Sequence, residues 1–210
     1  MMDFETYVME QIGKHPSLEM TEPQFSRLRP VLEKIAQERR GEQVYVIALD
    51  GRAASGKSTM AKQLGTILDA DVVQMDDFFL PPALRTEERF RQPGGNVHYE
   101  RFLEEVIPHL SAPEGFSYRV FDCGKMDYNG TKHIKSKEFR IVEGSYSCHP
   151  AFGDYADLTV FLQVEPEEQM RRILARNGEA MAQRFRSKWI PLEETYFAHH
   201  SVAERADLQL

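Results

Sequence analysis

The sequence has little cysteine: Cys123 and Cys148 are the only two cysteines among its 210 residues. They do not form a C-x-x-C pair and show no other metal-ligand spacing. We therefore expect reduced thiols in a cytoplasmic protein, with neither a disulfide framework nor a cysteine-bound metal. A chain of this length can bury enough surface to fold without such cross-links.

Long apolar runs are also lacking. The longest covers residues 44–49, far short of the ~20 apolar residues that span a bilayer. The opening MMDFETYVMEQIGKHP carries early acids and no apolar core, so it does not match a secretory signal. We expect no membrane segment.

Positive charge is in the minority, with 26 Lys and Arg against 33 Asp and Glu, a formal net charge of −7. Nucleic-acid binding needs a basic face, so we expect no nucleic-acid partner. A phosphate ligand held by a few local groups stays possible. The exception to the overall sign is segment 171–188, where basic residues outnumber the single acid Glu179.

The apolar pattern predicts an α/β fold in three layers, with a mostly parallel sheet of about five strands and helices on both faces. Helices are expected over 3–14, 21–41, 58–68, 98–110, 167–176 and 193–204. Strands are expected over 43–49, 71–74, 118–121, 139–142, 158–164 and 207–210. Thr21 and Gln24 fit a capping box, and Pro30 should kink or divide the helix that follows. Prolines and glycines make 76–97 a long loop, and 122–137 reads as a polar connection.

The strongest signal is GRAASGKS at 51–58, a full match to the phosphate-binding pattern G-x-x-x-x-G-K-[ST]. Its glycines permit backbone geometry that turns N–H groups toward phosphate oxygens. Lys57 would contact the β- and γ-phosphates of ATP, and the Ser58 hydroxyl would bind Mg²⁺. The following helix directs its positive N-terminal end at the same anion. The predicted nucleotide-binding residues are Gly51, Ala53, Ala54, Ser55, Gly56, Lys57, Ser58 and Thr59.

Acidic residues follow two of the predicted strands. Asp76 comes after 71–74, where a carboxylate could orient a substrate hydroxyl and accept its proton. Glu143 ends 139–142, at a position suited to hold the metal directly or through water. Each could instead be a solvated residue at a strand end.

Arginines could cover the transferring phosphoryl group. Arg171, Arg172 and Arg176 lie at helical spacing before Asn177 and Gly178, and arginines on a mobile segment can neutralise phosphoryl charge. The alternative is a solvated helix face. Phe78 could wall a substrate pocket or pack in the core.

The sequence resembles the uridine kinase-like branch of P-loop kinases, which also includes phosphoribulokinase and pantothenate kinase. The resemblance is carried by ALDGRAASGKST, QMDDFFLP, NVHYERF, IVEGSYS, RRILARNG and KWIPLEETYF, which cover most of 43–210. It implies a kinase domain over 42–210 with a short arginine-rich lid near 171–188. Residues 1–41 have no counterpart in the nucleoside kinases, and we expect them to form a helical extension packed on the core.

The resemblance also implies residue roles. Asp76 matches the presumed general base, Glu143 the acid near Mg²⁺, and Arg172 and Arg176 the lid arginines. Tyr118 matches a tyrosine that lines the nucleoside pocket, and we expect Asp76, Phe78, Tyr118 and Arg171 on the substrate side. The histidine that follows this tyrosine in nucleoside kinases is missing, because the sequence here is YRVFDC.

The expected reaction is transfer of the γ-phosphoryl group of ATP, with Mg²⁺, to a hydroxyl of a small metabolite. A uridine kinase-like reaction on a nucleoside is the leading prediction. A sugar phosphate, a pantothenate-like acid or a vitamin is the alternative acceptor, and a regulatory ATPase without an acceptor is the alternative class. A homo-oligomer is possible.

Overall fold

The computed structural model describes residues 6, 10, 13–14, 21–39 and 43–210. The helix predicted over 3–14 lies mostly outside the described residues. The second predicted helix is α2 (Glu22–Glu38). The Thr21 N–H donates to Gln24 Oε1 over 2.8 Å, as in the predicted capping box.

Pro30 does not divide α2, so the prediction of a division there is wrong. A proline inside a helix costs about 3 kcal/mol. Against this, α2 buries a stripe of aliphatic side chains, each of which contributes about 1.5–3 kcal/mol. The stripe consists of Leu28, Val31, Leu32 and Ile35. Packing therefore outweighs the hydrogen bond that Pro30 removes.

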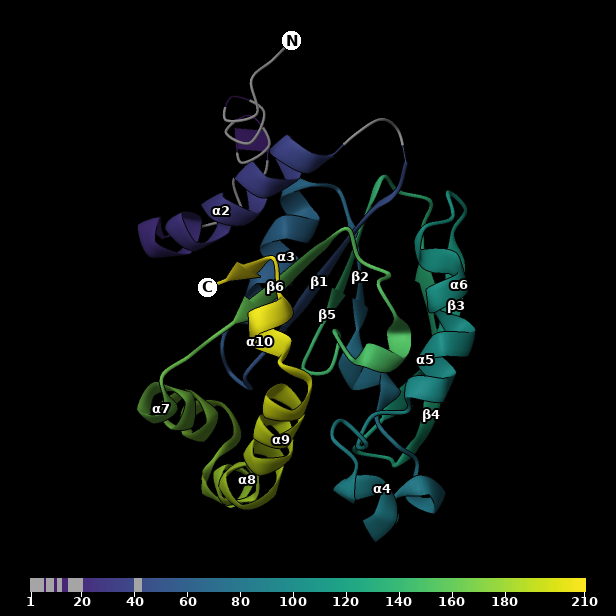
Figure 1. The fold of residues 1–210 in the computed structure, drawn as a ribbon, viewed down its shortest axis with the longest axis vertical. Coiled ribbons are helices and arrows are strands. Elements are labelled where there is room, and N and C mark those ends of the chain that lie inside the picture. The colour runs from purple at the N-terminus through teal and green to yellow at the C-terminus, as the bar shows by residue number, and fades with distance from the viewer. Residues whose placement is uncertain (1–5, 7–9, 11–12, 15–20, 40–42) are drawn as a thin grey trace.

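A five-stranded sheet forms the centre of the molecule, with strand order β2-β5-β1-β6-β7 (Figure 1). Its strands are β1 (Tyr45–Gly51), β2 (Asp71–Gln74), β5 (Phe139–Glu143), β6 (Leu158–Leu162) and β7 (Leu208–Gln209). All pairings within this sheet are parallel. The predicted α/β fold with about five parallel strands is confirmed.

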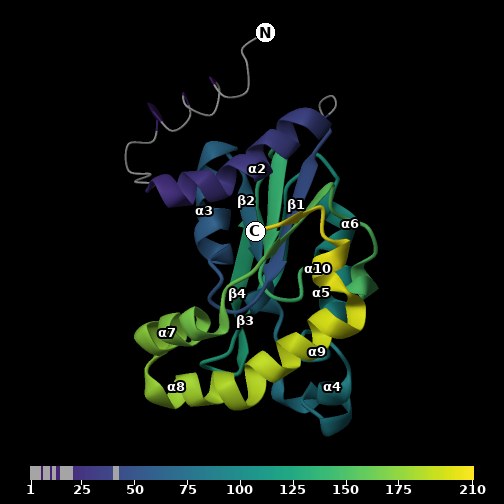
Figure 2. The same ribbon diagram turned by 60° about the vertical axis from the view of Figure 1, so that its left-hand side comes forward.

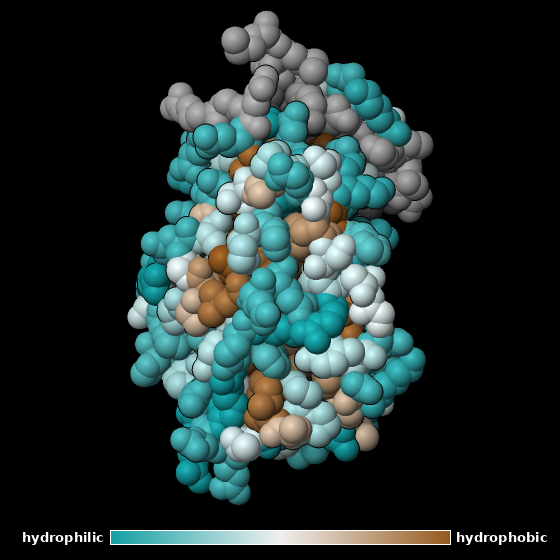
Figure 3. Space-filling model, turned by 90° about the vertical axis from the view of Figure 1, so that its right-hand side faces the viewer, coloured by the Kyte–Doolittle hydropathy of each residue, from teal (hydrophilic) through white to brown (hydrophobic). Residues whose placement is uncertain are grey.

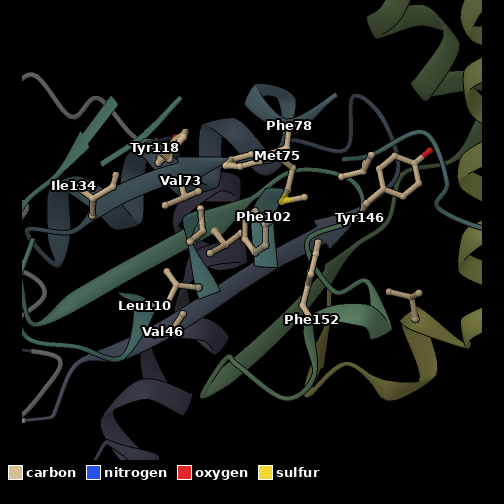
Figure 4. Close-up of a cluster of buried hydrophobic side chains, with 14 of the residues drawn as sticks. Val46, Val73, Met75, Phe78, Phe102, Leu110, Tyr118, Ile134, Tyr146 and Phe152 are labelled. Atoms are coloured by element: carbon tan, nitrogen blue, oxygen red, sulfur yellow. The ribbon is translucent and has the colours of Figure 1, made fainter. Parts of the chain in front are cut away.

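Two hydrophobic cores cover the two faces of the sheet, because successive side chains of a strand point to opposite faces. Ile47 of β1 packs with α2 and α3 (Lys57–Ile67) on one face. Val46 belongs to the other core, with α5 (Tyr99–Glu105), α6 (Ile107–Leu110), α9 (Ile190–His200) and α10 (Val202–Arg205). Figure 2 shows the helices on either side of the sheet, and Figure 4 shows part of the second core.

The expected strand at 118–121 is real but lies outside the main sheet. It belongs to β3 (Phe116–Asp122), which pairs antiparallel with β4 (Asp127–Ile134) in a separate two-stranded ribbon. The prediction of a mere connection over 122–137 is wrong. Most β4 side chains are exposed, so the strand lacks the apolar pattern that would have revealed it.

The segment predicted as a long loop over 76–97 contains short helical pieces. They are the 3₁₀ turns η1 (Met75–Phe78) and η2 (Pro82–Leu84) and the helix α4 (Glu87–Arg91). Phe79 and Val97 form an antiparallel bridge that joins the two ends of the segment. The helix predicted over 98–110 is split into α5 and α6, with Pro108 in the first turn of the second piece.

Residues 166–200 form a connected series of helices, drawn below the sheet in Figure 1. The series consists of α7 (Pro166–Asn177), α8 (Glu179–Arg184), the π-helical turn η4 (Phe185–Trp189) and α9. The short 3₁₀ turn η3 (Pro150–Phe152) lies earlier in the chain. The helix predicted over 193–204 starts earlier, at Ile190, and is interrupted at Ser201, whose φ is 49°.

The face over α5, α6 and the β3–β4 ribbon is mostly hydrophilic, with apolar side chains in small separate patches (Figure 3). None of the helices in the described part of the chain is long and apolar enough to cross a membrane.

Candidate active site

The phosphate-binding loop joins the end of β1 to the start of α3, as the motif predicts. Gly51 has a φ of 129°, and a Cβ there would lie 2.1 Å from the Leu162 carbonyl oxygen. Gly56 has a φ of 104°, and Ala54, between them, has a φ of 57°. The two motif glycines therefore allow a close approach to β6 and a left-handed turn that other residues rarely adopt.

Side chains from several elements hold the loop carbonyls. Every carbonyl oxygen from Gly51 to Ser55 accepts a hydrogen bond from a side chain. Lys57 Nζ donates to the Gly51 and Arg52 carbonyls (2.7 and 2.8 Å), Gln169 to that of Ala53 (3.1 Å), Arg172 to that of Ala54 (3.1 Å), and Arg27 to that of Ser55 (2.8 Å). The direction of each peptide group is therefore fixed before any ligand binds.

The N–H groups at the start of α3 remain available to an anion. In the described part of the chain, the N–H groups of Gly56, Lys57 and Ser58 have no acceptor. The first N–H groups of a helix lack partners within the helix and carry its positive partial charge. Ser58 and Thr59 are exposed in this first turn, while Ser55 is buried behind it. Such an arrangement of N–H groups suits an anionic ligand.

Asp50 is a buried carboxylate that the sequence analysis missed. One oxygen accepts from the Gly51 and Tyr146 N–H groups, and the other from the Cys148 N–H and the Tyr196 hydroxyl. Burial raises its pKa, and the bonds from Cys148 and Gly51 oppose that rise. Asp50 thereby joins the loop to α9. Its position between an apolar strand and Gly51 was a signal that could have found it.

Glu193 on α9 is a second missed carboxylate. Its Oε2 accepts from the Ala53 N–H (2.9 Å), and its Oε1 accepts from the Ser145 hydroxyl (2.8 Å). Burial raises its pKa, with Lys57 opposing the rise. No local pattern in the sequence marks this residue, because its partner lies 140 residues away.

Ser58 and Glu143 come together as the resemblance implies for a metal site. The Ser58 hydroxyl donates to Glu143 Oε2 over 3.3 Å. Glu143 is 6% exposed, and its pKa is raised by burial and by the nearby Asp76. Two neighbouring carboxylates and a hydroxyl are hard oxygen donors of the kind that bind Mg²⁺. The described residues contain no cluster of three or more His, Cys, Asp or Glu side chains for a metal, so the remaining ligands would be phosphate oxygens and water.

Asp76 lies just beyond β2, in η1. Asp76 is exposed as a residue. Protein nevertheless surrounds its carboxylate closely enough that partial desolvation raises the pKa of Asp76. Lys57 and Arg176 are near enough to lower the pKa of Asp76, and Asp77 raises it further. The structure thus brings Asp76 together with the loop lysine and one of the arginines.

Phe78 and Tyr118 lie in the core, where Phe78 is fully buried and Tyr118 is 2% exposed. Their ring centroids are 5.1 Å apart (Figure 4), and the Tyr118 hydroxyl donates to Asp77 Oδ2 over 2.8 Å. Lys132 of β4 lies 3.9 Å from the same oxygen. The structure does not bring either ring to an open surface. Tyr118, packed against Phe78, instead holds the carboxylate of Asp77, next to Asp76.

The three predicted arginines are placed differently. Arg172 bonds both the Ala54 carbonyl and Glu168. Arg176 donates to the Asn177 side chain and lies close enough to Asp76 for its charge to lower the pKa of that carboxyl. Arg171 is exposed and forms an ion pair with Glu168 at 2.6 Å. The structure therefore joins Arg172 and Arg176 to the site and leaves Arg171 outside it.

Solved structures of two kinases share this fold. A possible uridine kinase from Bacillus stearothermophilus superposes with a TM-score of 0.69 and 19% identity, over 88% of this chain and 97% of the other. A putative fructose transport system kinase from Silicibacter sp. TM1040 gives 0.67 and 24%, over 91% and 100%. The predicted resemblance to this group of kinases is confirmed in the fold.

Sequence relatives are distant kinases. The chain is 25% identical to a pantothenate kinase from Shewanella sediminis, over 81% of this chain and 60% of that protein. It is 24% identical to a cytidylate kinase from Nitrosococcus oceani, over 62% and 69%. No family model matches the sequence. The chain spans about 60% of the length of the pantothenate kinase that it matches.

Proposed function

We propose that this chain transfers the γ-phosphoryl group of ATP to a hydroxyl of a small metabolite. The observation that supports this most is the convergence of three groups at the carboxyl ends of neighbouring strands. Lys57 follows β1, Asp76 follows β2, and Glu143 ends β5 and bonds Ser58. In open α/β sheets, ligands bind beyond these strand ends.

Asp76 acts on the acceptor. Its carboxylate orients the attacking hydroxyl and takes its proton as the new P–O bond forms, while the bond between the γ-phosphorus and the bridging oxygen to the β-phosphate breaks. The products are the phosphorylated acceptor and ADP. Because its surroundings raise the pKa of Asp76, the rate falls as the pH is lowered through that pKa.

Positive groups stabilise the phosphates. Lys57 exchanges its bonds to the Gly51 and Arg52 carbonyls for phosphate oxygens, and the N–H groups at the start of α3 complete the cradle. Arg172 and Arg176 bring charge from α7 to the transferring group. Mg²⁺, held by Ser58 and Glu143, would neutralise charge on the β- and γ-phosphates.

A nucleoside stays the leading acceptor, as the resemblance to uridine kinases implies. The second candidate is another small alcohol, such as a pantothenate-like acid, a sugar phosphate or a vitamin. It is favoured by the relatives named pantothenate kinase. It is also favoured by Cys123, which stands near Asp76, in the region where nucleoside kinases carry a histidine.

The test is ATP consumption by the purified chain with Mg²⁺ and a panel of nucleosides, pantothenate, sugar phosphates and vitamins. We expect one acceptor class to raise the rate, and Asp76→Asn to lower that rate by about 10²–10⁴-fold while ATP still binds. The matched control is Asp77→Asn, the same change one residue away, where the carboxylate bonds Tyr118 and the loss should be much smaller.

Two results would contradict the proposal. An unchanged rate in Asp76→Asn would remove the assigned base. Slow hydrolysis that no acceptor accelerates would favour a regulatory ATPase, the alternative class.

A further inference from the structure

Helix α2 packs on α3 and the sheet, and one of its side chains reaches the phosphate-binding loop. Its buried side chains, among them Leu28 beside Arg27, share one core with α3 and with β1. Figure 2 shows α2 running across the sheet next to α3. This packing fixes the side of α2 from which Arg27 extends toward the loop.

Within the described residues, Arg27 makes three hydrogen bonds, all to main-chain oxygens of distant segments. Its Nη1 donates to Ser55 in the loop over 2.8 Å, and its Nη2 donates to Gln163 (2.9 Å) and Leu210 (3.1 Å). One guanidinium thus joins the loop to the segment after β6 and to the end of β7. Lysine could not reproduce this planar, forked arrangement of donors.

The bond to Ser55 restrains the peptide group that precedes the phosphate-binding N–H groups. The Ser55 carbonyl and the Gly56 N–H belong to the same planar trans peptide and point in opposite directions. Because Arg27 holds the carbonyl on the side of α2, the Gly56 N–H points to the opposite side of the loop. A Cβ on Gly56 would lie 3.6 Å from Arg27 Nη1. The guanidinium charge is therefore also beside the peptide that faces the phosphates.

The surroundings of Arg27 disfavour its positive charge. Burial and the nearby Arg172 both lower its pKa, and the two cations bond neighbouring carbonyls of the loop, those of Ser55 and Ala54. A polyanion in front of the loop would relieve the repulsion between them, since each charge gains a partner of opposite sign.

We infer that Arg27 is a positioning residue for the phosphate-binding loop, through which α2 sets the affinity of the chain for ATP. This inference rests on the proposed function, because it concerns the same nucleotide site. Arg27 itself touches no reacting atom; it acts through the Ser55–Gly56 peptide.

The test compares Arg27→Ala and Arg27→Lys with the wild-type chain. We expect Arg27→Ala to weaken ATP binding about tenfold in calorimetry, the effect of one charge-assisted hydrogen bond. Arg27→Lys should fall between the two. In steady-state assays KM for ATP should rise and KM for the acceptor should stay unchanged. Without nucleotide, loop residues 51–58 should exchange amide hydrogens faster.

The matched control is Arg29→Ala on the same helix, where Arg29 is exposed and pairs with Glu33 at 2.9 Å; it should leave ATP binding unchanged. ATP affinity in Arg27→Ala equal to that of the wild type would overturn the inference. If Arg27→Ala does not fold, Arg27→Lys is measured in its place, and wild-type ATP affinity in that variant would overturn the inference. A wild-type chain that binds no ATP would instead overturn the proposed function, and this role with it.

Discussion

The proposed nucleotide side and the proposed acceptor side of the site are held together by different forces. On the nucleotide side, polar side chains from distant parts of the chain bond the backbone of the loop. Beneath the proposed acceptor side, buried rings pack on one another. The Phe102 ring centroid lies 5.0 Å from that of Phe78 and 4.4 Å from that of Phe152, and Tyr118 lies beside Phe78 (Figure 4).

This difference has a functional consequence. Hydrogen bonds fix the direction of each peptide group, which a phosphate cradle needs because its ligand is the same in every cycle. The hydrophobic burial of the rings is non-directional, so it holds a wall in place while leaving the exposed groups on that wall free to differ. We therefore expect changes on the acceptor side to alter stability and acceptor binding, with ATP binding spared.

The largest effect should come from Phe102→Ala. Phe102 is fully buried at the centre of the acceptor-side rings, and such truncations cost about 3–5 kcal/mol. Urea denaturation should show this loss. In the folded fraction of Phe102→Ala, KM for the acceptor should rise, while ATP affinity, measured by calorimetry, stays unchanged.

Leu103→Ala is the matched control for that change. Leu103 is the next residue of α5 and is 36% exposed, so its truncation should cost far less. Equal losses of ATP affinity and acceptor affinity in Phe102→Ala would break the distinction between the two sides.

A pH effect of intermediate size should arise at His149. Its ring lies between Tyr99 (5.1 Å) and Tyr196 (5.9 Å), and its Nδ1 accepts from the Ala151 N–H. Burial and the nearby His200 lower the pKa of His149 to about 4, and Arg89 adds to this while Glu100 opposes it.

The folded state therefore prefers neutral His149, whereas the unfolded chain binds a proton near pH 6.5. The stabilisation is complete above about pH 6.5 and is lost as the pH falls toward 4, by up to about 3 kcal/mol. Urea midpoints across this range measure the loss. His149→Phe keeps a ring between the tyrosines and cannot titrate, so its urea midpoint should fall less steeply with falling pH than that of the wild type. Identical slopes would show that other groups cause the pH dependence.

The smallest effect should come from Glu193→Gln on the nucleotide side. The amide oxygen can still accept from the Ala53 N–H, and the amide NH₂ can donate to the Ser145 hydroxyl, which then donates to the Gly51 carbonyl 3.0 Å away. Stability should change by about 1 kcal/mol or less. A melting curve checks this. A loss as large as that of Phe102→Ala would mean that a charge, and not hydrogen-bond geometry, holds the loop.

The sequence predicted the parts of the site whose chemistry is contiguous along the chain. The loop from Gly51 to Ser58, the acid after β2 and the acid that ends β5 were all visible, because an apolar strand followed by a glycine turn or a carboxylate is a local pattern. The structure brings Lys57, Asp76 and Glu143 together through the parallel order of β1, β5 and β2.

Errors occurred where tertiary packing overrides local pattern. Strand β4 is mostly exposed and was predicted as a connection, because its stability comes from pairing with β3 and not from an apolar face. Pro30 stays inside α2 because the helix is packed against α3 and the sheet.

The glycine turn from Gly51 to Ser58 and the α/β fold around it follow from the sequence alone, since residues close in sequence specify that turn through their own backbone preferences. Which groups hold the loop depends on tertiary packing. Arg27 and Glu193 reach it from 28 and 140 residues away, and no local preference encodes contacts that exist only after the helices have packed on the sheet.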